Sequence, residues 1–130
     1  MKHYNVVAAV VCHDGKYLCM QKGKTKFEYT SYKWEFPGGK IEPGETPQQA
    51  LARELMEEME YPVEVGEELV TLNHEYPDFS ITMTAFLCTP KGDANGFRRR
   101  EHAGSKWCSK DELKGLNWAA ADIDVVEGIL

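Results

Sequence analysis

The sequence predicts a mixed α/β (α+β) fold, and three observations support this class. Residues 6–12 form a continuous apolar, β-branched run, as expected for a strand that is covered on both faces. Residues 63–73 and 81–88 have strand-like composition around a turn, which predicts an antiparallel pair. Between these strands, capping signals at residue 46 predict a helix. Strands and a helix therefore alternate along the chain.

The length and composition are those of one globular domain, residues 1–130. Hydrophobic residues make up 42% and charged residues 28% of the chain, which is ordinary for a soluble protein. The net charge of −6 argues against stable nucleic-acid or anionic-lipid binding, because attraction to phosphate supplies that affinity. The longest apolar run is too short to cross a bilayer, and the start lacks a signal-peptide pattern. We therefore expect a cytoplasmic protein without membrane contact.

Turn, glycine and capping signals predict the remaining elements. In order, these are a turn at 13–16, a strand at 17–21, a polar loop at 22–33, an extended piece at 34–39, a loop at 91–104, a strand around Trp107, a short helix at 109–113 and a closing helix at 119–130. The turn at 13–16 predicts a hairpin between its flanking strands. The loop at 22–33 either contacts substrate or is solvated. We expect the basic cluster Arg98–Arg100 to be solvated.

The central helix has well-marked ends. Thr46 is followed by Pro47, and Gln49 stands at the third helical position, which predicts a reciprocal capping box. Pro62 cannot continue the helix, so it should end near Glu60 or Tyr61. The apolar stripe that would pack on the sheet consists of Ala50, Leu51 and Leu55.

The same helix carries an acidic face. Glu54, Glu57 and Glu58 stand at i, i+3 and i+4, which stacks three carboxylates about one turn apart. Like charges at this spacing destabilise a helix by roughly 0.2–0.5 kcal/mol per pair, and no lysine lies within the run. A bound hard cation would compensate the repulsion, whereas a merely solvated face is the plainer alternative. A calcium loop is excluded, because its twelve-residue Asp/Asn pattern is absent.

This region resembles the Nudix box, a pattern of Gly, five residues, Glu, seven residues, then Arg-Glu-aliphatic-x-Glu-Glu. The matching residues are Gly39, Glu45, Arg53, Glu54, Leu55, Glu57 and Glu58. The 34–40 segment, the turn at 76–78 and the Trp107 region are similar to mutator-type nucleoside triphosphate pyrophosphohydrolases of this family. The resemblance implies an α/β/α sandwich with a mixed sheet between helices. One departure is Glu60, where the pattern has glycine; a left-handed cap there would cost more than at glycine.

The resemblance also implies the roles of the acidic residues. It implies that Mg²⁺ or Mn²⁺ is held by Glu54, Glu57, Glu58 and the carbonyl of Gly38. Arg53 and Glu45 resemble the internal ion pair that orients these carboxylates. Glu101 corresponds to one further glutamate that binds metal or assists deprotonation of water, and Lys22 to a cation that contacts phosphate.

The base-recognition residues are expected outside the Nudix box. Asp122 stands in a segment similar to the base-recognition segment of CTP-preferring and oxidised-nucleotide-cleaving relatives. In the 8-oxo-guanine-selective relatives this position tends to be an asparagine, so the resemblance implies that an aspartate here favours a pyrimidine such as CTP or 5-hydroxy-dCTP. An ionised carboxylate accepts hydrogen bonds only, which suits an exocyclic amino group. Alternatively, Asp122 caps the last helix. Phe36, Tyr76 and Phe79 are expected to border the base or to belong to the core instead, and Asp78 is expected to contact substrate.

The implied activity is Mg²⁺-dependent hydrolysis of a nucleoside triphosphate to monophosphate and pyrophosphate, a form of nucleotide-pool sanitation. Metal ions would align water, neutralise phosphate charge and stabilise the leaving group. The partner expected is a small nucleotide, with the protein a monomer or weak homodimer. Two alternatives stay open: a hydrolase of a nucleoside-diphosphate sugar or dinucleoside polyphosphate, and a non-catalytic Nudix-fold nucleotide-binding module.

Overall fold

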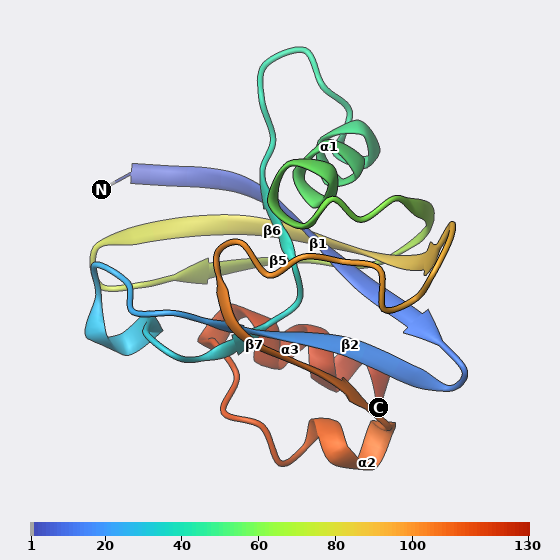
Figure 1. Cartoon of the computed structure of the whole chain (residues 1–130). Coiled ribbons are helices and arrows are strands. Elements are labelled where there is room, and N and C mark those ends of the chain that lie inside the picture. The colour runs from blue at the N-terminus through green and yellow to red at the C-terminus, as the bar shows by residue number, and fades with distance from the viewer. Residues whose placement is uncertain (1) are drawn as a thin grey trace.

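The computed structural model describes residues 2–130. These residues form seven strands and three α-helices. Helix α1 lies on one side of the strands, and α2 and α3 lie on the other (Figure 1). The elements are β1 Lys2–His13, β2 Lys16–Lys22, β3 Trp34–Glu35, β4 Gly38–Lys40, α1 Pro47–Met59, β5 Val63–Glu75, β6 Phe79–Pro90, β7 His102–Cys108, α2 Lys110–Leu113 and α3 Ala120–Ile129. A 3₁₀ turn at Glu28–Thr30 interrupts the polar loop. This arrangement confirms the predicted sandwich of helices around a sheet.

The sheet is mixed, and β1 lies at its centre. The main path is β3-β2-β1-β6-β5, with β4 paired to β1 and β7 paired to β2. β1 and β6 run parallel in the register Val6↔Met83, whereas the other pairs are antiparallel. The apolar run at 6–12 is therefore covered on both faces, as its composition predicts.

Local turn chemistry explains the two predicted hairpins. Asp14 and Gly15 both have positive φ, 51° and 74°, as a tight two-residue connection between twisted antiparallel strands requires. Between β5 and β6, the Tyr76 N–H donates to the Phe79 carbonyl at 2.7 Å and closes the turn at 76–78. Both strand pairs are present as predicted.

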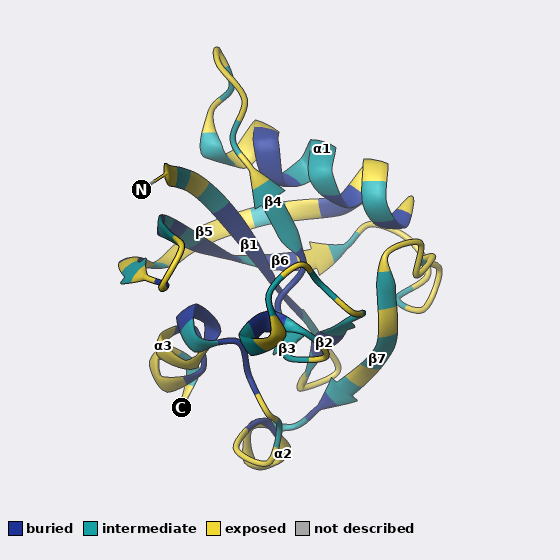
Figure 2. Cartoon of the chain, turned by 90° about the vertical axis from the view of Figure 1, so that its left-hand side faces the viewer, coloured by how far each residue is buried: buried dark blue, intermediate teal, exposed yellow. Residues whose placement is uncertain are grey.

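Helix α1 begins with the predicted capping box and buries one face. The Gln49 N–H donates to Thr46 Oγ1 at 3.1 Å, and the Thr46 N–H donates to Gln49 Oε1 at 3.0 Å. Its buried residues are Ala50, Leu51, Leu55 and Met59. Figure 2 shows that this face turns towards the strands while the opposite face is exposed. One hydrophobic cluster lies under α1, and a second lies under α3.

Helix α1 ends at Glu60 in the left-handed conformation, with φ 49° and ψ 42°. Its N–H donates to the Met56 carbonyl at 3.0 Å, so the backbone turns as a glycine terminus would. The left-handed conformation costs an L-residue with a Cβ roughly 1–2 kcal/mol. The helix therefore keeps a left-handed cap at Glu60, where the sequence indicated that it would cost more than at glycine.

The C-terminal third differs in one respect from the sequence prediction. β7 begins at His102, inside the region predicted as a loop to residue 104, because it pairs with β2 from Lys22 onward. Local composition cannot reveal such a partner eighty residues away. Ser109 caps α2 with Glu112 as predicted. None of the helices formed by residues 2–130 has the length and apolar character needed to cross a membrane.

Candidate active site

The acidic face of α1 borders a groove beside β4. The groove has a volume of about 460 Å³, and its lining includes Gly39, Glu54 and Glu58. The Glu54 carboxylate lies directly against Gly39: a Cβ added to Gly39 would sit 2.4 Å from the Glu54 carboxyl carbon. Glycine at 39 therefore makes room for this carboxylate.

Gly38 is required by a different close approach. In the antiparallel pairing of β4 with β1, Gly38 stands opposite Ala8. A Cβ at Gly38 would lie 1.9 Å from the Val7 carbonyl oxygen, which is backbone and cannot rotate away. The glycine pair thus lets β4 fit between β1 and α1, with Gly39 lining the acidic groove and Gly38 lining the cavity beside it.

Arg53 joins the elements around this groove. Its Nε and Nη2 donate to the two carboxylate oxygens of Glu45 at 2.6 and 2.9 Å, and Nη2 also donates to the Lys40 carbonyl at 3.0 Å. Nη1 lies 3.1 Å from both Glu54 Oε1 and Glu57 Oε2. The bond to Arg53 lowers the pKa of Glu45. The acidic face therefore has a basic partner, contrary to the expectation drawn from the absence of lysine.

The remaining carboxylates repel one another around Glu58. Burial raises the pKa of Glu58 to about 8, and the neighbouring charges of Glu54, Glu101 and Glu35 add to this effect. The predicted residue Glu101 is among these charges, although it is distant from α1 in sequence. Such crowding of oxygen donors is unfavourable unless a cation or protons compensate it.

The donor set fits a hard divalent cation. Carboxylate oxygens and a backbone carbonyl are the ligands that Mg²⁺ and Mn²⁺ prefer. Within residues 2–130, no three His, Cys, Asp or Glu side chains are arranged at metal-binding distances. Glu57 is turned to Arg53, its side chain is 60% exposed, and it does not line the groove.

An inner cavity of about 170 Å³ opens beside the glycine pair. Five of the residues predicted to contact substrate line it: Lys22, Phe36, Tyr76, Phe79 and Asp122. Phe36 and Tyr76 are also buried core residues, so the cavity wall and the core share side chains. Gly39 lines both this cavity and the acidic groove, which makes the two spaces neighbours.

Asp122 is buried at the end of the inner cavity, with 3% of its surface exposed. Its Oδ1 accepts the Phe36 N–H at 3.0 Å, whereas the N-cap of α3 is Ala119. Asp122 therefore ties α3 to the 34–39 segment and does not act as the cap. Burial, and then the charge of Glu35, raises its pKa to about 8. The burial of Asp122 thus favours its protonated form, whereas an ionised carboxylate was expected from the sequence.

Glu35 and His102 were not predicted from the sequence. Glu35 Oε1 lies 3.5 Å from Lys22 Nζ, and Oε2 lies 3.1 Å from Nε2 of His102, whose side chain is only 4% exposed. The Lys22 side chain at the inner cavity therefore forms an ion pair with the Glu35 carboxylate. The one signal in the sequence that could have pointed to Glu35 was its position three residues before Gly38.

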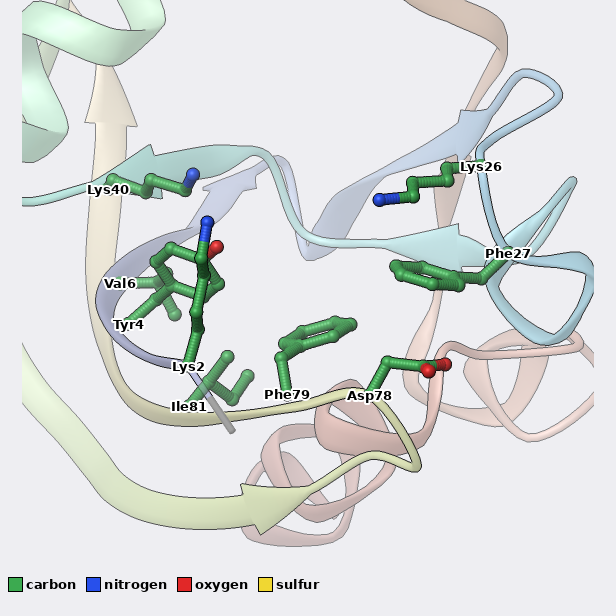
Figure 3. Close-up of a pocket in the computed structure, with 9 residues that line it drawn as sticks. All are labelled: Lys2, Tyr4, Val6, Lys26, Phe27, Lys40, Asp78, Phe79 and Ile81. Atoms are coloured by element: carbon green, nitrogen blue, oxygen red, sulfur yellow. The ribbon is translucent and has the colours of Figure 1, made fainter.

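A larger outer cavity of about 850 Å³ adjoins the inner one across Val6, Phe79 and Ile81, which line both. Figure 3 shows three lysines around aromatic rings there. The lysines are Lys2, Lys26 and Lys40, and the rings belong to Tyr4, Phe27 and Phe79. The predicted substrate residue Asp78 lies at this cavity, where it accepts a hydrogen bond from the Tyr29 hydroxyl at 2.7 Å.

Comparison with known proteins identifies the family to which the chain is similar. The family model described as a NUDIX domain matches residues 1–127. The CTP pyrophosphohydrolase of Escherichia coli (strain K12) is 36% identical over 131 residues, covering 100% of this chain and 93% of the relative. The 8-oxo-dGTP diphosphatase of Proteus vulgaris is 40% identical over 88 residues, covering 68% and 78%. The solution structure of the E. coli ORF135 protein superimposes with a TM-score of 0.82 at 35% identity, covering 99% and 89%.

Alanine substitutions at the glycine pair should separate fold from site. Gly38→Ala forces a Cβ against a backbone carbonyl, and we expect a loss of several kcal/mol, at the upper end of single substitutions. Gly39→Ala displaces only the Glu54 side chain, and we expect a cost of about 1 kcal/mol but a loss of divalent-cation affinity. Urea unfolding and Mn²⁺ titration measure the two effects. Equal loss of stability in both variants would contradict this assignment.

Asp122→Asn should change the pH dependence of stability. Between the ordinary aspartate pKa of 3.8 and the raised pKa of about 8, the folded state holds a proton that the unfolded state releases, so stability falls as pH rises. Asparagine keeps an acceptor for the Phe36 N–H but does not titrate. We expect the stability of the variant relative to wild type to rise across pH 4–8, on the order of 1 kcal/mol per unit, and to level off above. A difference that is constant with pH in urea unfolding would refute this.

Proposed function

The chain belongs to the Nudix family of hydrolases, and from this premise we propose that it cleaves a CTP-like or oxidised deoxynucleoside triphosphate. The products are nucleoside monophosphate and pyrophosphate, and the activity sanitises the nucleotide pool. One observation carries this proposal: the acidic groove and the inner cavity meet at Gly39. A triphosphate in the groove and a base in the cavity can therefore belong to one nucleotide.

The polyphosphate end of the site is assigned to α1 and β4. Glu54, Glu57, Glu58 and the Gly38 carbonyl are the proposed ligands of Mg²⁺ or Mn²⁺, with Glu101 as a further carboxylate. A divalent cation held there supplies charge neutralisation to the phosphate oxygens. Arg53 fixes the carboxylates of Glu54 and Glu57, and one carboxylate of the set accepts the proton of the attacking water. Lys22 faces the phosphates from the inner cavity.

The base end is assigned to Asp122 and the aromatic walls. A protonated Asp122 offers an O–H donor beside an acceptor oxygen. Cytosine presents the complementary pair, an exocyclic amino donor beside a ring-nitrogen acceptor. Phe36 and Phe79 supply flat apolar surface for the ring. This polarity supports a cytosine-type base, and the name of the E. coli relative, CTP pyrophosphohydrolase, agrees with it.

A second candidate function rests on the outer cavity. Its size and its three lysines suit a second anionic, ring-bearing group joined to the same substrate. Hydrolysis of a dinucleoside polyphosphate, or of a nucleoside-diphosphate sugar, would use both cavities. In either case the partner is a small nucleotide, and we propose that the protein acts as a monomer or weak homodimer.

A substrate panel with product identification tests the proposal. The purified protein is incubated in Mg²⁺ with CTP, dCTP, 5-hydroxy-dCTP, 8-oxo-dGTP, a nucleoside-diphosphate sugar and a dinucleoside polyphosphate. We expect monophosphate and pyrophosphate from a triphosphate, with cytosine-type bases preferred. Faster release of a sugar phosphate, or of two nucleotides from the dinucleotide, would replace the main proposal with the second. No turnover of any compound would favour the non-catalytic binding module.

Removal of one helix carboxylate should abolish most of the turnover. We expect Glu57→Gln and Glu58→Gln to lower Mg²⁺-dependent kcat roughly 100-fold or more, since even partners of metal ligands contribute 10–100-fold. Circular dichroism and unfolding should stay close to wild type. Glu64→Gln is the matched control, because Glu64 is exposed on β5 away from the groove. Wild-type turnover in both variants would show that these residues are not ligands.

A further inference from the structure

The side chain of Glu60 holds a segment of the 91–101 loop on the end of α1. Arg98 Nε lies 2.9 Å from Glu60 Oε2, and Arg100 Nη2 bonds the same oxygen. The Arg98 N–H also donates to the Met59 carbonyl at 2.8 Å. The arginines are exposed, as expected, and two of them also pair with the residue that stands where the family pattern has glycine.

The residue on the other side of Glu101 is anchored as well. His102 is buried, and its Nε2 contacts the Glu35 carboxylate at 3.1 Å while its backbone starts β7 opposite Lys22. Glu101 thus lies between Arg100, fixed to α1, and His102, fixed to the 34–39 segment. Neighbouring Cα atoms are 3.8 Å apart, so two anchored neighbours leave Glu101 little freedom.

We propose that Glu60 is a positioning residue that directs Glu101 to the acidic groove through Arg98 and Arg100. The loop is held on the C-terminal end of α1 by the bond from the Arg98 N–H to the Met59 carbonyl and by both ion pairs of Glu60, and Glu101 follows directly after Arg100. The inference rests on the proposed function, in which Glu101 belongs to the catalytic carboxylates. It also explains why a residue with a Cβ occupies a left-handed position: the ion pairs require a side chain that glycine lacks.

The exposure of the ion pairs makes this role separable from stability. The side chains of Arg98 and Arg100 are 72% and 55% exposed, and exposed ion pairs contribute little to the free energy of unfolding. Glycine at 60 would in addition relieve the left-handed backbone. Loss of Glu60 should therefore loosen the loop without weakening the fold.

The test begins with Glu60→Gly, which restores the residue of the family pattern. We expect kcat to fall about 3–10-fold, because small displacements of a catalytic group cost this much or more. KM should change less than about two-fold, since the substrate contacts are elsewhere, and the urea midpoint should stay equal or rise. Arg100→Gln should lower kcat similarly. Lys91→Gln, an equal charge change in the same loop away from Glu60, should match wild type.

The second arm repeats Glu60→Gly in a Glu101→Gln background. If Glu60 acts through Glu101, the added substitution lowers kcat no further. An undiminished kcat in Glu60→Gly alone, or an equal loss in both backgrounds, overturns the inference. Wild-type kcat in Glu101→Gln overturns it too, together with the role of Glu101. The helix carboxylates are tested separately by the glutamine variants at 57 and 58, so failure here is distinguishable from failure of the proposed function.

Discussion

The contacts of Arg53 are the interaction on which the rest of the site depends. One guanidinium group binds the loop before α1 through Glu45, the end of β4 through the Lys40 carbonyl, and the acidic face through Glu54 and Glu57. The planar fork of arginine allows all these bonds from one side chain. Without it, like charges one turn apart would turn away from each other into solvent. Arg53 thus holds the carboxylates on the side of the helix where β4 approaches.

That approach depends in turn on the two glycines. The absence of a side chain at Gly38 makes room for the backbone of β1, and its absence at Gly39 makes room for the Glu54 carboxylate. β4 therefore lies closer to its neighbours than residues with side chains would permit. The same strand separates the acidic groove from the inner cavity. The chemistry of cleavage and the choice of base are therefore placed on adjoining surfaces by one short segment, while their residues come from β2, β6, α1 and α3.

Local patterns in the sequence were sufficient for some of these features. The capping box at Thr46, the hairpin at Asp14-Gly15 and the stacking of Glu54 with Glu58 depend on residues within one or two turns, and each was predicted. The position of Glu101 came from the family resemblance. Its role as a catalytic carboxylate stays a prediction.

Features that depend on burial or on distant partners were not predicted. Glu35 meets His102 across 67 residues, and Glu60 meets Arg100 across 40, so neither pair has a local signal. Asp122 was expected to be ionised because aspartate ordinarily is, whereas the burial that raises its pKa exists only in the folded protein. The sequence indicated that a left-handed cap would cost more at Glu60 than at glycine, but neither the presence of this cap nor the contacts of the Glu60 side chain were predicted.

The central claim is that one guanidinium group arranges the carboxylates for metal-dependent cleavage, and Arg53→Lys tests it most directly. Lysine keeps the charge but not the fork that binds Glu45 and the acidic face together. The measurement is kcat for the preferred triphosphate as a function of Mg²⁺ concentration, with unfolding monitored in parallel. We predict a fall in kcat of roughly 10–100-fold and half-saturation at higher Mg²⁺ in a folded protein. Wild-type kcat and wild-type Mg²⁺ dependence in this variant would contradict the claim.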